Sequence, residues 1–201
     1  MKRKFISLLA AACMIFLFAG CSGSSFTDNE IIEAAVNLIA ESIPVNEIYF
    51  GKGLAAVAED SEAAAAFARE IKTSVSLLQY LPVDKSTGYD SVDRIKEATE
   101  KIYSESYCAY LYEMAFTGIS DEGSTATYAR YMETEGGTLA VRKNFTVIDT
   151  RTYGTEVQVV SKKGNSAVVE VQSYVDGKED AVVEVQMVYE NGAWRLDSPT
   201  Y

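Results

Sequence analysis

The sequence predicts an α+β fold in which helices from the first half of the chain pack on an antiparallel sheet from the second half. Apolar residues recur at helical spacing between residues 31 and 115, then alternate with polar residues between 155 and 197. Helices followed by consecutive strands are typical of α+β proteins, whereas α/β proteins alternate the two. With 201 residues, 48% of them hydrophobic, the chain is long enough for one folded domain.

The first twenty residues have the pattern of an export signal. Three basic residues at 2–4 precede an apolar run at 5–18. That run is shorter than the ~20 residues that a membrane-spanning helix needs. It ends in Ala-Gly-Cys at 19–21, followed by the polar stretch 22–25.

This arrangement resembles the lipobox of bacterial lipoproteins, where a cysteine after small residues receives diacylglycerol and becomes the mature N-terminus. The resemblance implies a signal peptide at 1–20, a lipidated, palmitate-bearing Cys21 with a flexible tether at 21–28, and a folded domain at 29–201. It also implies a lipid anchor in the cell membrane, with the domain on the extracytoplasmic face. An ordinary signal peptide or an uncleaved anchor, with Cys21 incidental, is the alternative.

Composition excludes several classes of function. The chain carries 18 Lys and Arg against 29 Asp and Glu, and because three of the basic groups lie at 2–4, residues 21–201 carry a net charge of −14. Such an acidic domain repels phosphate backbones, so nucleic acid is not expected as a partner. Histidine is absent, which removes Ser-His-Asp and Cys-His catalysis and every histidine metal site. We expect no metal site and no cofactor.

Four helices are expected in the first half of the domain. Thr27 and Glu30 have the spacing of a capping box, and the helix that they begin should end before Pro44. The three further helices are expected at about 61–72, 91–102 and 104–115, with a short strand at 75–83 between them. The alanine-rich helix at 61–72 has a thin apolar face, which suggests loose packing, and residues 45–80 as a whole stay difficult to assign.

Strands fill the second half. Residues 128–135 and 138–143 have the pattern of a hairpin, and an antiparallel meander should follow at 155–161, 167–175, 181–189 and 193–197. The alternation of apolar and polar residues predicts a sheet covered on one face. Trp194, in the last strand, should point inward.

The closing strand at 189–197 and the preceding helices resemble the NTF2-like (SnoaL-like) superfamily, over residues 29–201. A weaker similarity, in element order alone, is to secreted inhibitors of cell-wall endopeptidases. The NTF2-like resemblance implies a curved sheet forming a cone, whose open end holds a small molecule or performs acid–base chemistry.

The residues expected at such a cone are Tyr128, Arg130, Tyr131 and Asp149, which we interpret as candidate ligand-binding residues. An Asp base assisted by a tyrosine would make the same cone an enzyme, because burial can raise a carboxyl pKa. Polar residues that alternate along a strand are also the ordinary solvated face of a sheet. No catalytic residue is therefore assigned.

The tyrosines suggest a second kind of site. Tyr110 and Tyr112 are candidate partner-binding residues, since tyrosine combines an apolar ring with a hydroxyl group. The alternative is that these rings fill the space between helix and sheet. Cys108 is expected to be a buried, inert thiol. Residues 51–56 have the G-x-G-x-x-A spacing of a pyrophosphate loop, but without a βαβ context they predict a plain glycine turn.

The sequence therefore predicts a membrane-anchored extracytoplasmic lipoprotein that acts as a non-catalytic binding module for an envelope protein or a small ligand. The alternatives are an enzyme with an Asp/Tyr pair in the cone and an inhibitor of a cell-wall hydrolase. The one partner that specific residues predict is the membrane, bound through a lipidated Cys21. The sequence leaves the oligomeric state open, a dimer included.

Overall fold

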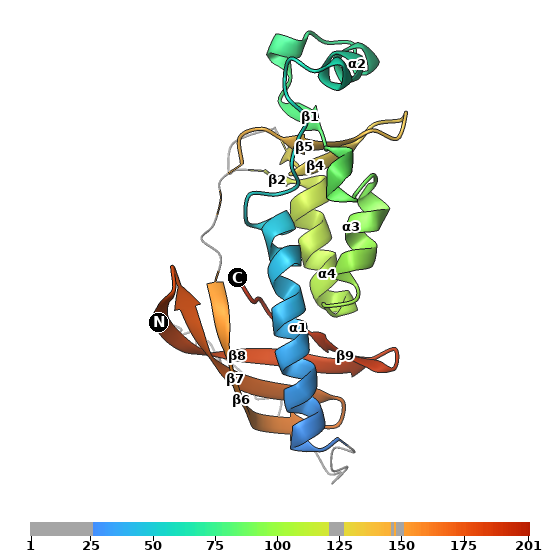
Figure 1. Cartoon of the computed structure of the whole chain (residues 1–201). Coiled ribbons are helices and arrows are strands. Elements are labelled where there is room, and N and C mark those ends of the chain that lie inside the picture. The colour runs from blue at the N-terminus through green and yellow to red at the C-terminus, as the bar shows by residue number, and fades with distance from the viewer. Residues whose placement is uncertain (1–25, 121–126, 146, 148–150) are drawn as a thin grey trace, which may run out of the picture.

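Helix α1 (Asp28–Tyr49) is the longest element, and the main sheet of the protein lies against it (Figure 1). The computed structural model describes residues 26–120, 127–145, 147 and 151–201. Thr27 caps α1 through the expected capping box. The Glu30 amide donates to the Thr27 hydroxyl, and the Thr27 amide donates to the Glu30 carboxylate.

The expected end of this helix at Pro44 is wrong. Pro44 is exposed and lies inside α1, which continues to Tyr49. The residues after the proline explain why, because Val45, Ile48 and Tyr49 are at most 5% exposed and belong to the main core. Burying three such side chains contributes more than the ~3 kcal/mol that a proline costs in a helix.

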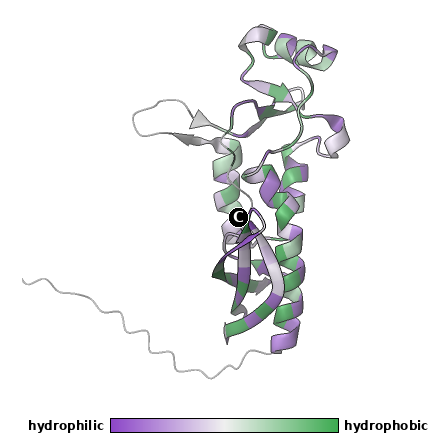
Figure 2. Ribbon diagram, turned by 60° about the vertical axis from the view of Figure 1, so that its left-hand side comes forward, coloured by the Kyte–Doolittle hydropathy of each residue, from purple (hydrophilic) through white to green (hydrophobic). Residues whose placement is uncertain are grey.

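The main sheet consists of β6 (Arg151–Lys163), β7 (Ser166–Val175), β8 (Lys178–Glu190) and β9 (Ala193–Leu196), paired antiparallel in chain order. This is the expected meander, with β6 beginning four residues earlier than predicted. Its inner face buries Val157, Val169, Val171, Val185, Met187 and Leu196. Polar residues alternate with them, and Figure 2 shows the resulting change of hydropathy along each strand.

Aromatic rings hold the start of α1 to the last hairpin. The Phe26 ring lies 4.5 Å from the Tyr189 ring and 5.0 Å from the Trp194 ring, measured between centroids. Trp194 is 8% exposed, so its expected inward orientation is confirmed. Lys162 adds an ion pair to Asp28 at 2.7 Å and a hydrogen bond to the Phe26 carbonyl. The chain is therefore held in place from residue 26 onward.

Two short helices lie beside α1 (Figure 1), and both begin at the expected serine caps. They are α3 (Val92–Thr99) and α4 (Glu105–Tyr112), and α4 continues as a wider helical turn, η3 (Glu113–Thr117), that ends at Gly118. The C-terminal segment runs along α1. There the Thr200 hydroxyl meets Asn46, Tyr103 and Ser42 at 3.0, 2.8 and 2.8 Å.

A second layer covers the C-terminal end of α1. It contains α2 (Glu62–Glu70) and a small sheet of order β1-β5-β4, formed by β1 (Tyr80–Pro82), β5 (Leu139–Arg142) and β4 (Tyr131–Glu133). Two short helical turns, η1 (Val75–Leu77) and η2 (Lys85–Thr87), flank β1. Phe67, Leu78, Leu81 and Ala140 form a separate small core here. A two-stranded ladder joins β2 (Ile119–Ser120) to β3 (Thr127–Tyr128).

The α+β class is thus confirmed, with two corrections of detail. Of the strand expected at 75–83, only residues 80–82 form one, preceded by a helical turn. The hairpin expected at 128–143 narrows to β4 and β5. Strand β5 pairs with β4 on one side and with β1 on the other, and the three strands stay apart from the main sheet. No helix among the described residues is long and apolar enough to cross a bilayer.

Candidate ligand-binding site

A hollow of about 550 Å³ lies in the second layer, between α2, the end of β1 and the start of β5. Its apolar lining includes Val57, Phe67, Pro82, Val83 and Leu139. Pockets of this size and apolar character are typical of small-molecule sites.

The hollow exists because α2 is built from small residues. Ala63 and Ala66 line it and stay exposed, while the adjacent Phe67 is only 1% exposed and packs in the small core. Ser61 caps the helix as expected, its hydroxyl accepting from the Ala64 amide at 3.1 Å. The thin apolar face seen in the sequence therefore leaves space beside the helix.

Charged groups surround the apolar floor. Glu70, Asp84, Lys85 and Asp90 line the hollow, together with Tyr89 and Thr138. Hydrogen bonds from Thr134 and Thr138 hold the pKa of Glu70 below its usual value, and bonds from Ser86 do the same for Asp84. Both carboxylates thus stay ionised at neutral pH. The arrangement suits a ligand with an apolar body and a cationic group.

Arg130 and Tyr131, two of the four candidate ligand residues, lie next to each other but outside this hollow. Both are buried, at 1% and 0% exposure. The Arg130 guanidinium donates to the carbonyls of Tyr49 at 2.9 Å and Gly51 at 2.5 Å. The Tyr131 hydroxyl donates to the Ile48 carbonyl at 2.8 Å and accepts from the Leu54 amide at 3.0 Å. Together they hold the chain where it leaves α1, and any role for them in ligand binding stays a prediction.

For three other candidate residues the structure does not describe the side chain. The backbone of Tyr128 is in β3, and its side chain lies outside the described part. Asp149 and Cys21 also fall outside the described residues, so neither the Asp/Tyr pair nor the lipid anchor has a geometry here.

Tyr110 and Tyr112 lie on different faces of α4. Tyr110 is 52% exposed, and its ring lies 5.9 Å from that of Tyr107. The Tyr112 hydroxyl donates to the Glu100 carboxylate at 3.0 Å, and its ring packs beside Phe116. Since positions two apart on a helix do not face each other, the two tyrosines form no common patch.

Cys108 is buried, as expected, and the inertness of its thiol stays a prediction. It is 3% exposed, and burial raises the pKa of its thiol to about 11. The glycine motif is a plain turn, also as expected. Gly53 has φ of +78°, and the amides of Lys52, Gly53 and Leu54 bond to the Glu47 carboxylate, the Glu47 carbonyl and the Tyr131 hydroxyl. No amide of these three is left for a phosphate.

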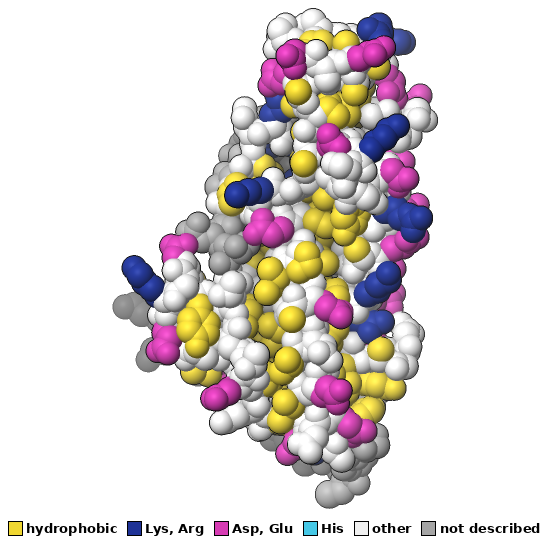
Figure 3. Space-filling view, viewed as in Figure 1, with side chains coloured by type: hydrophobic (Ala, Val, Ile, Leu, Met, Phe, Trp, Pro, Cys, Tyr) yellow, Lys and Arg dark blue, Asp and Glu magenta, His cyan; other side chains and the backbone are white. Residues whose placement is uncertain are grey.

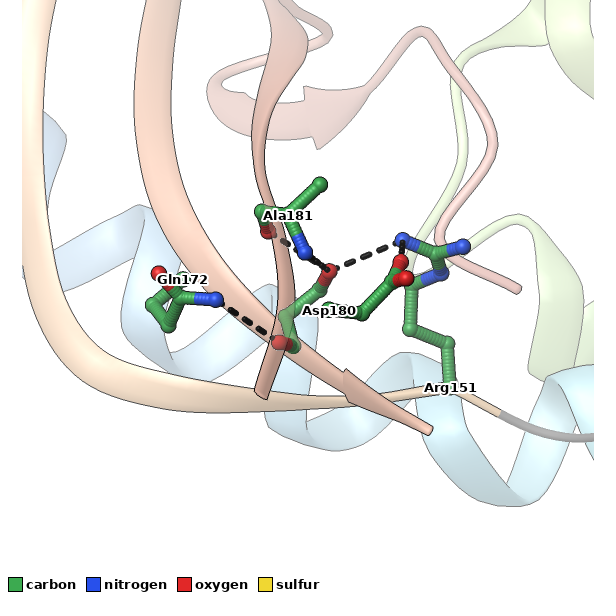
Figure 4. Close-up of polar contacts among 5 residues, drawn as sticks. Arg151, Gln172, Asp180 and Ala181 are labelled. Atoms are coloured by element: carbon green, nitrogen blue, oxygen red, sulfur yellow. Dashed lines mark hydrogen bonds and ion pairs between the residues drawn. The ribbon is translucent and has the colours of Figure 1, made fainter. Parts of the chain in front are cut away.

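A polar cluster at the far end of the main sheet has no free nucleophile. Ser173 is fully buried at the bulge between β7 and β8 (Figure 4). Its hydroxyl donates to the Ala181 carbonyl at 2.7 Å and accepts from Arg151 at 2.8 Å. Arg151 also pairs with Asp180 at 2.7 Å. The hydroxyl thus has no neighbouring base, and the cluster serves to fix the bulge.

Among the described residues, no group of three or more His, Cys, Asp or Glu side chains is placed to hold a metal ion. The comparisons with known proteins give no further guide. No family model matches the chain. A search of curated proteins also finds no match.

Sequence reasoning missed the residues around the hollow. Its walls come from residues 57–70, 82–90 and 137–139, segments that lie far apart in the chain. The run of alanines in α2 was the available signal, because side chains as small as those of Ala63 and Ala66 leave space beside the helix.

Proposed function

We propose that the chain is a lipid-anchored extracytoplasmic binding module, and that the hollow between α2 and β5 takes its small ligand. The apolar floor with a mostly acidic edge supports this proposal. The ligand that fits has an apolar body and a positively charged group, because three carboxylates and one amine surround the floor. The lipobox-like segment at 19–21 supports the anchored location.

We also assign the domain to the NTF2-like superfamily as part of this proposal. A long N-terminal helix against a four-stranded antiparallel meander supports the assignment. The small sheet and α2, which hold the hollow, are additions to that plan. The proposed site is thus separate from the inner face of the main sheet, where α1 and the C-terminal segment pack.

The test uses dansylcadaverine, a fluorescent amine with an aromatic body. We expect its emission to rise and shift to the blue on binding, because the dansyl ring leaves water. Ala66→Phe should abolish this change, since the new ring occupies the hollow from an exposed position that packs nothing. Ala40→Phe, at an exposed alanine of α1, is the matched control.

The charge of the probe is tested separately. Glu70→Gln should weaken binding several-fold, and dansylamide, which lacks the amine, should bind less well than dansylcadaverine. Equal loss of binding in Ala66→Phe and Ala40→Phe would contradict the proposed site. Equal binding of the charged and uncharged probes would contradict the ligand class.

A further inference from the structure

A second depression is lined in part by the segment that joins α1 to α2. It is an open groove of about 740 Å³, and its lining includes Leu54, Ala55, Ala56, Leu81 and Val141. The hollow described above begins at Val57, two residues beyond Ala55. The two depressions therefore share one segment but have different linings.

The groove gathers basic residues in an acidic protein. Lys52, Arg142 and Lys143 line it, against one carboxylate, Glu59. Residues 21–201 carry a net charge of −14, so a local excess of positive charge is the exception on this surface. Lys52 is exposed, whereas Lys143 keeps 22% of its side chain exposed and pairs with Glu59 at 3.1 Å. Glu59 itself is 60% exposed and can move away.

A buried cation lies directly beneath the groove. The Nη2 atom of Arg130 lies 2.6 Å from where a Cβ would stand on Gly53, which lines the groove. The Arg130 partners are neutral carbonyls, and its Nε atom is buried with no hydrogen-bond partner. Within the described residues no carboxylate pairs with this guanidinium. Its charge therefore adds to the potential of the groove, weakened little by solvent because the site is buried.

We propose that this groove binds a phosphate-class oxyanion carrying two or more negative charges. Arginine presents a planar pair of donors that matches phosphate oxygens, and the lysines add point charges on flexible stems. A single carboxylate would need only one of them. Since the amides of the glycine turn are occupied, the side chains of Lys52, Arg142 and Lys143 make the contacts.

The anion comes from solution and not from a lipid headgroup. The lining of the groove comes from the segment after α1 and from β1 and β5, which Figure 1 shows near the C-terminal end of that helix. The proposed anchor, Cys21, precedes the N-terminal end of α1 in the sequence. The two sources share one chemistry, so the experiment tests both. Tripolyphosphate is the soluble probe, and vesicles of phosphatidylglycerol present the headgroup.

Binding of tripolyphosphate is measured by titration calorimetry at low ionic strength, with the soluble domain. We expect Lys52→Glu to weaken binding at least tenfold and Arg142→Glu to do the same. Lys178→Glu is the matched control, since it changes net charge equally at an exposed lysine of β8 far along the chain. It should weaken binding less than twofold.

A gain of affinity gives a second readout. Glu59→Gln removes the carboxylate that competes for Lys143, so binding should tighten several-fold. Glu179→Gln removes the same charge from an exposed position of β8 and should leave the affinity nearly unchanged. Comparing the two variants distinguishes an effect of the groove on binding from an effect of the net charge of the molecule.

Three results would overturn the proposal. One is no binding by the wild type, and another is equal loss in Lys52→Glu and Lys178→Glu, which would show a response to net charge alone. The third is binding to the vesicles that Lys52→Glu abolishes, which would make a headgroup the source. Dansylcadaverine binding should persist in Lys52→Glu, so the proposal for the groove and the proposal for the hollow can be contradicted independently.

Discussion

Arg130 is a buried charged residue, and its guanidinium donates hydrogen bonds to backbone carbonyls at the C-terminal end of α1. The last carbonyls of α1 have no partners within the helix, and a cation beside them also interacts favourably with the helix dipole. Its guanidinium stacks on Phe145 at 4.0 Å from the ring centroid. Gly53 permits this approach because any side chain there would collide with the guanidinium.

Replacing Arg130 by methionine tests this role. Arg130→Met leaves the Tyr49 and Gly51 carbonyls without donors in a buried place, and we expect a loss of about 3 kcal/mol in unfolding free energy. Urea unfolding followed by circular dichroism measures it. Arg69→Met, at an exposed arginine of α2, should change stability by less than about 0.5 kcal/mol. A similar loss of unfolding free energy in both variants would contradict this role of Arg130.

Buried tyrosines predict a loss of stability at alkaline pH. Burial raises the pKa of Tyr103 and of Tyr153 to about 12, from the ordinary tyrosine value of 10.0. Between these two pH values the unfolded chain binds fewer protons than the native one, so stability falls as pH rises. Below pH 10 both states hold the protons, and these groups cause no change.

Tyr153→Phe isolates one of these groups, because its hydroxyl makes no hydrogen bond to any residue that the structure describes. The variant should match the wild type at pH 7 and lose less stability between pH 10 and 12, by about 1.4 kcal/mol per pH unit at most. Urea unfolding at several pH values gives the slope. Tyr110→Phe, at a half-exposed ring, is the control for removing a tyrosine hydroxyl and should match the wild type at pH 7.

At the scale of elements, the C-terminal segment is part of the core. Asn46, Tyr103 and Thr200 form a network in which every side chain is at most 3% exposed. The Tyr103 hydroxyl donates to Asn46 at 2.6 Å, and the Asn46 amide donates to the Thr200 carbonyl at 2.7 Å. The network joins α1, the start of α4 and the end of the chain.

Thr200→Val keeps the shape of the side chain and removes its hydroxyl. Three buried partners then lose a hydrogen bond, and we expect a loss of about 3 kcal/mol in unfolding free energy. Thr155→Val, at an exposed position of β6, should be nearly neutral. If thermal unfolding shows the two variants to be alike, the segment does not stabilise the core in this way.

Local sequence patterns predicted those helices and strands that a single local signal, such as a cap or an alternation, determines. Serine and threonine caps placed the starts of α1 to α4, and period-two alternation placed β6 to β9. Pro44 misled because tertiary burial of the following turn outweighs the local preference. The site was harder, since Phe67, Pro82 and Leu139 come together through long-range packing that no local spacing records.

On the scale of the whole molecule, charge and hydrophobic area are unevenly distributed. Figure 3 shows acidic side chains spread over the visible face, with hydrophobic ones along its middle, where α1 lies. Ala40 and Pro44 of α1 are exposed. The α+β class followed from the order of the elements, but the division into a main sheet and a second layer did not. That division depends on which strands pair, and alternation alone does not determine pairing.

The anchor itself is open to a direct test. Cys21→Ser removes the thiol that would carry the lipid, so the variant should leave the detergent phase in a Triton X-114 partition or accumulate as a larger precursor. Cys108→Ser, at the buried cysteine, should partition like the wild type. A Cys21→Ser protein that partitions and migrates like the wild type would contradict lipidation.

If Cys21 carries a lipid, the ring contacts of Phe26 with Tyr189 and Trp194 would determine how far the two depressions stand from the membrane. Only four residues, 22–25, lie between Cys21 and Phe26, and the five residue steps reach ~18 Å when fully extended. Helix α1 then adds the ~33 Å length of its 22 residues before the hollow and the groove begin. A lipid on Cys21 would keep the Phe26 end close to the headgroups, and the acidic surface would discourage the molecule from lying flat on an anionic leaflet. Helix α1 would then act as a strut, holding both depressions several nanometres out, where molecules that never touch the bilayer can reach them.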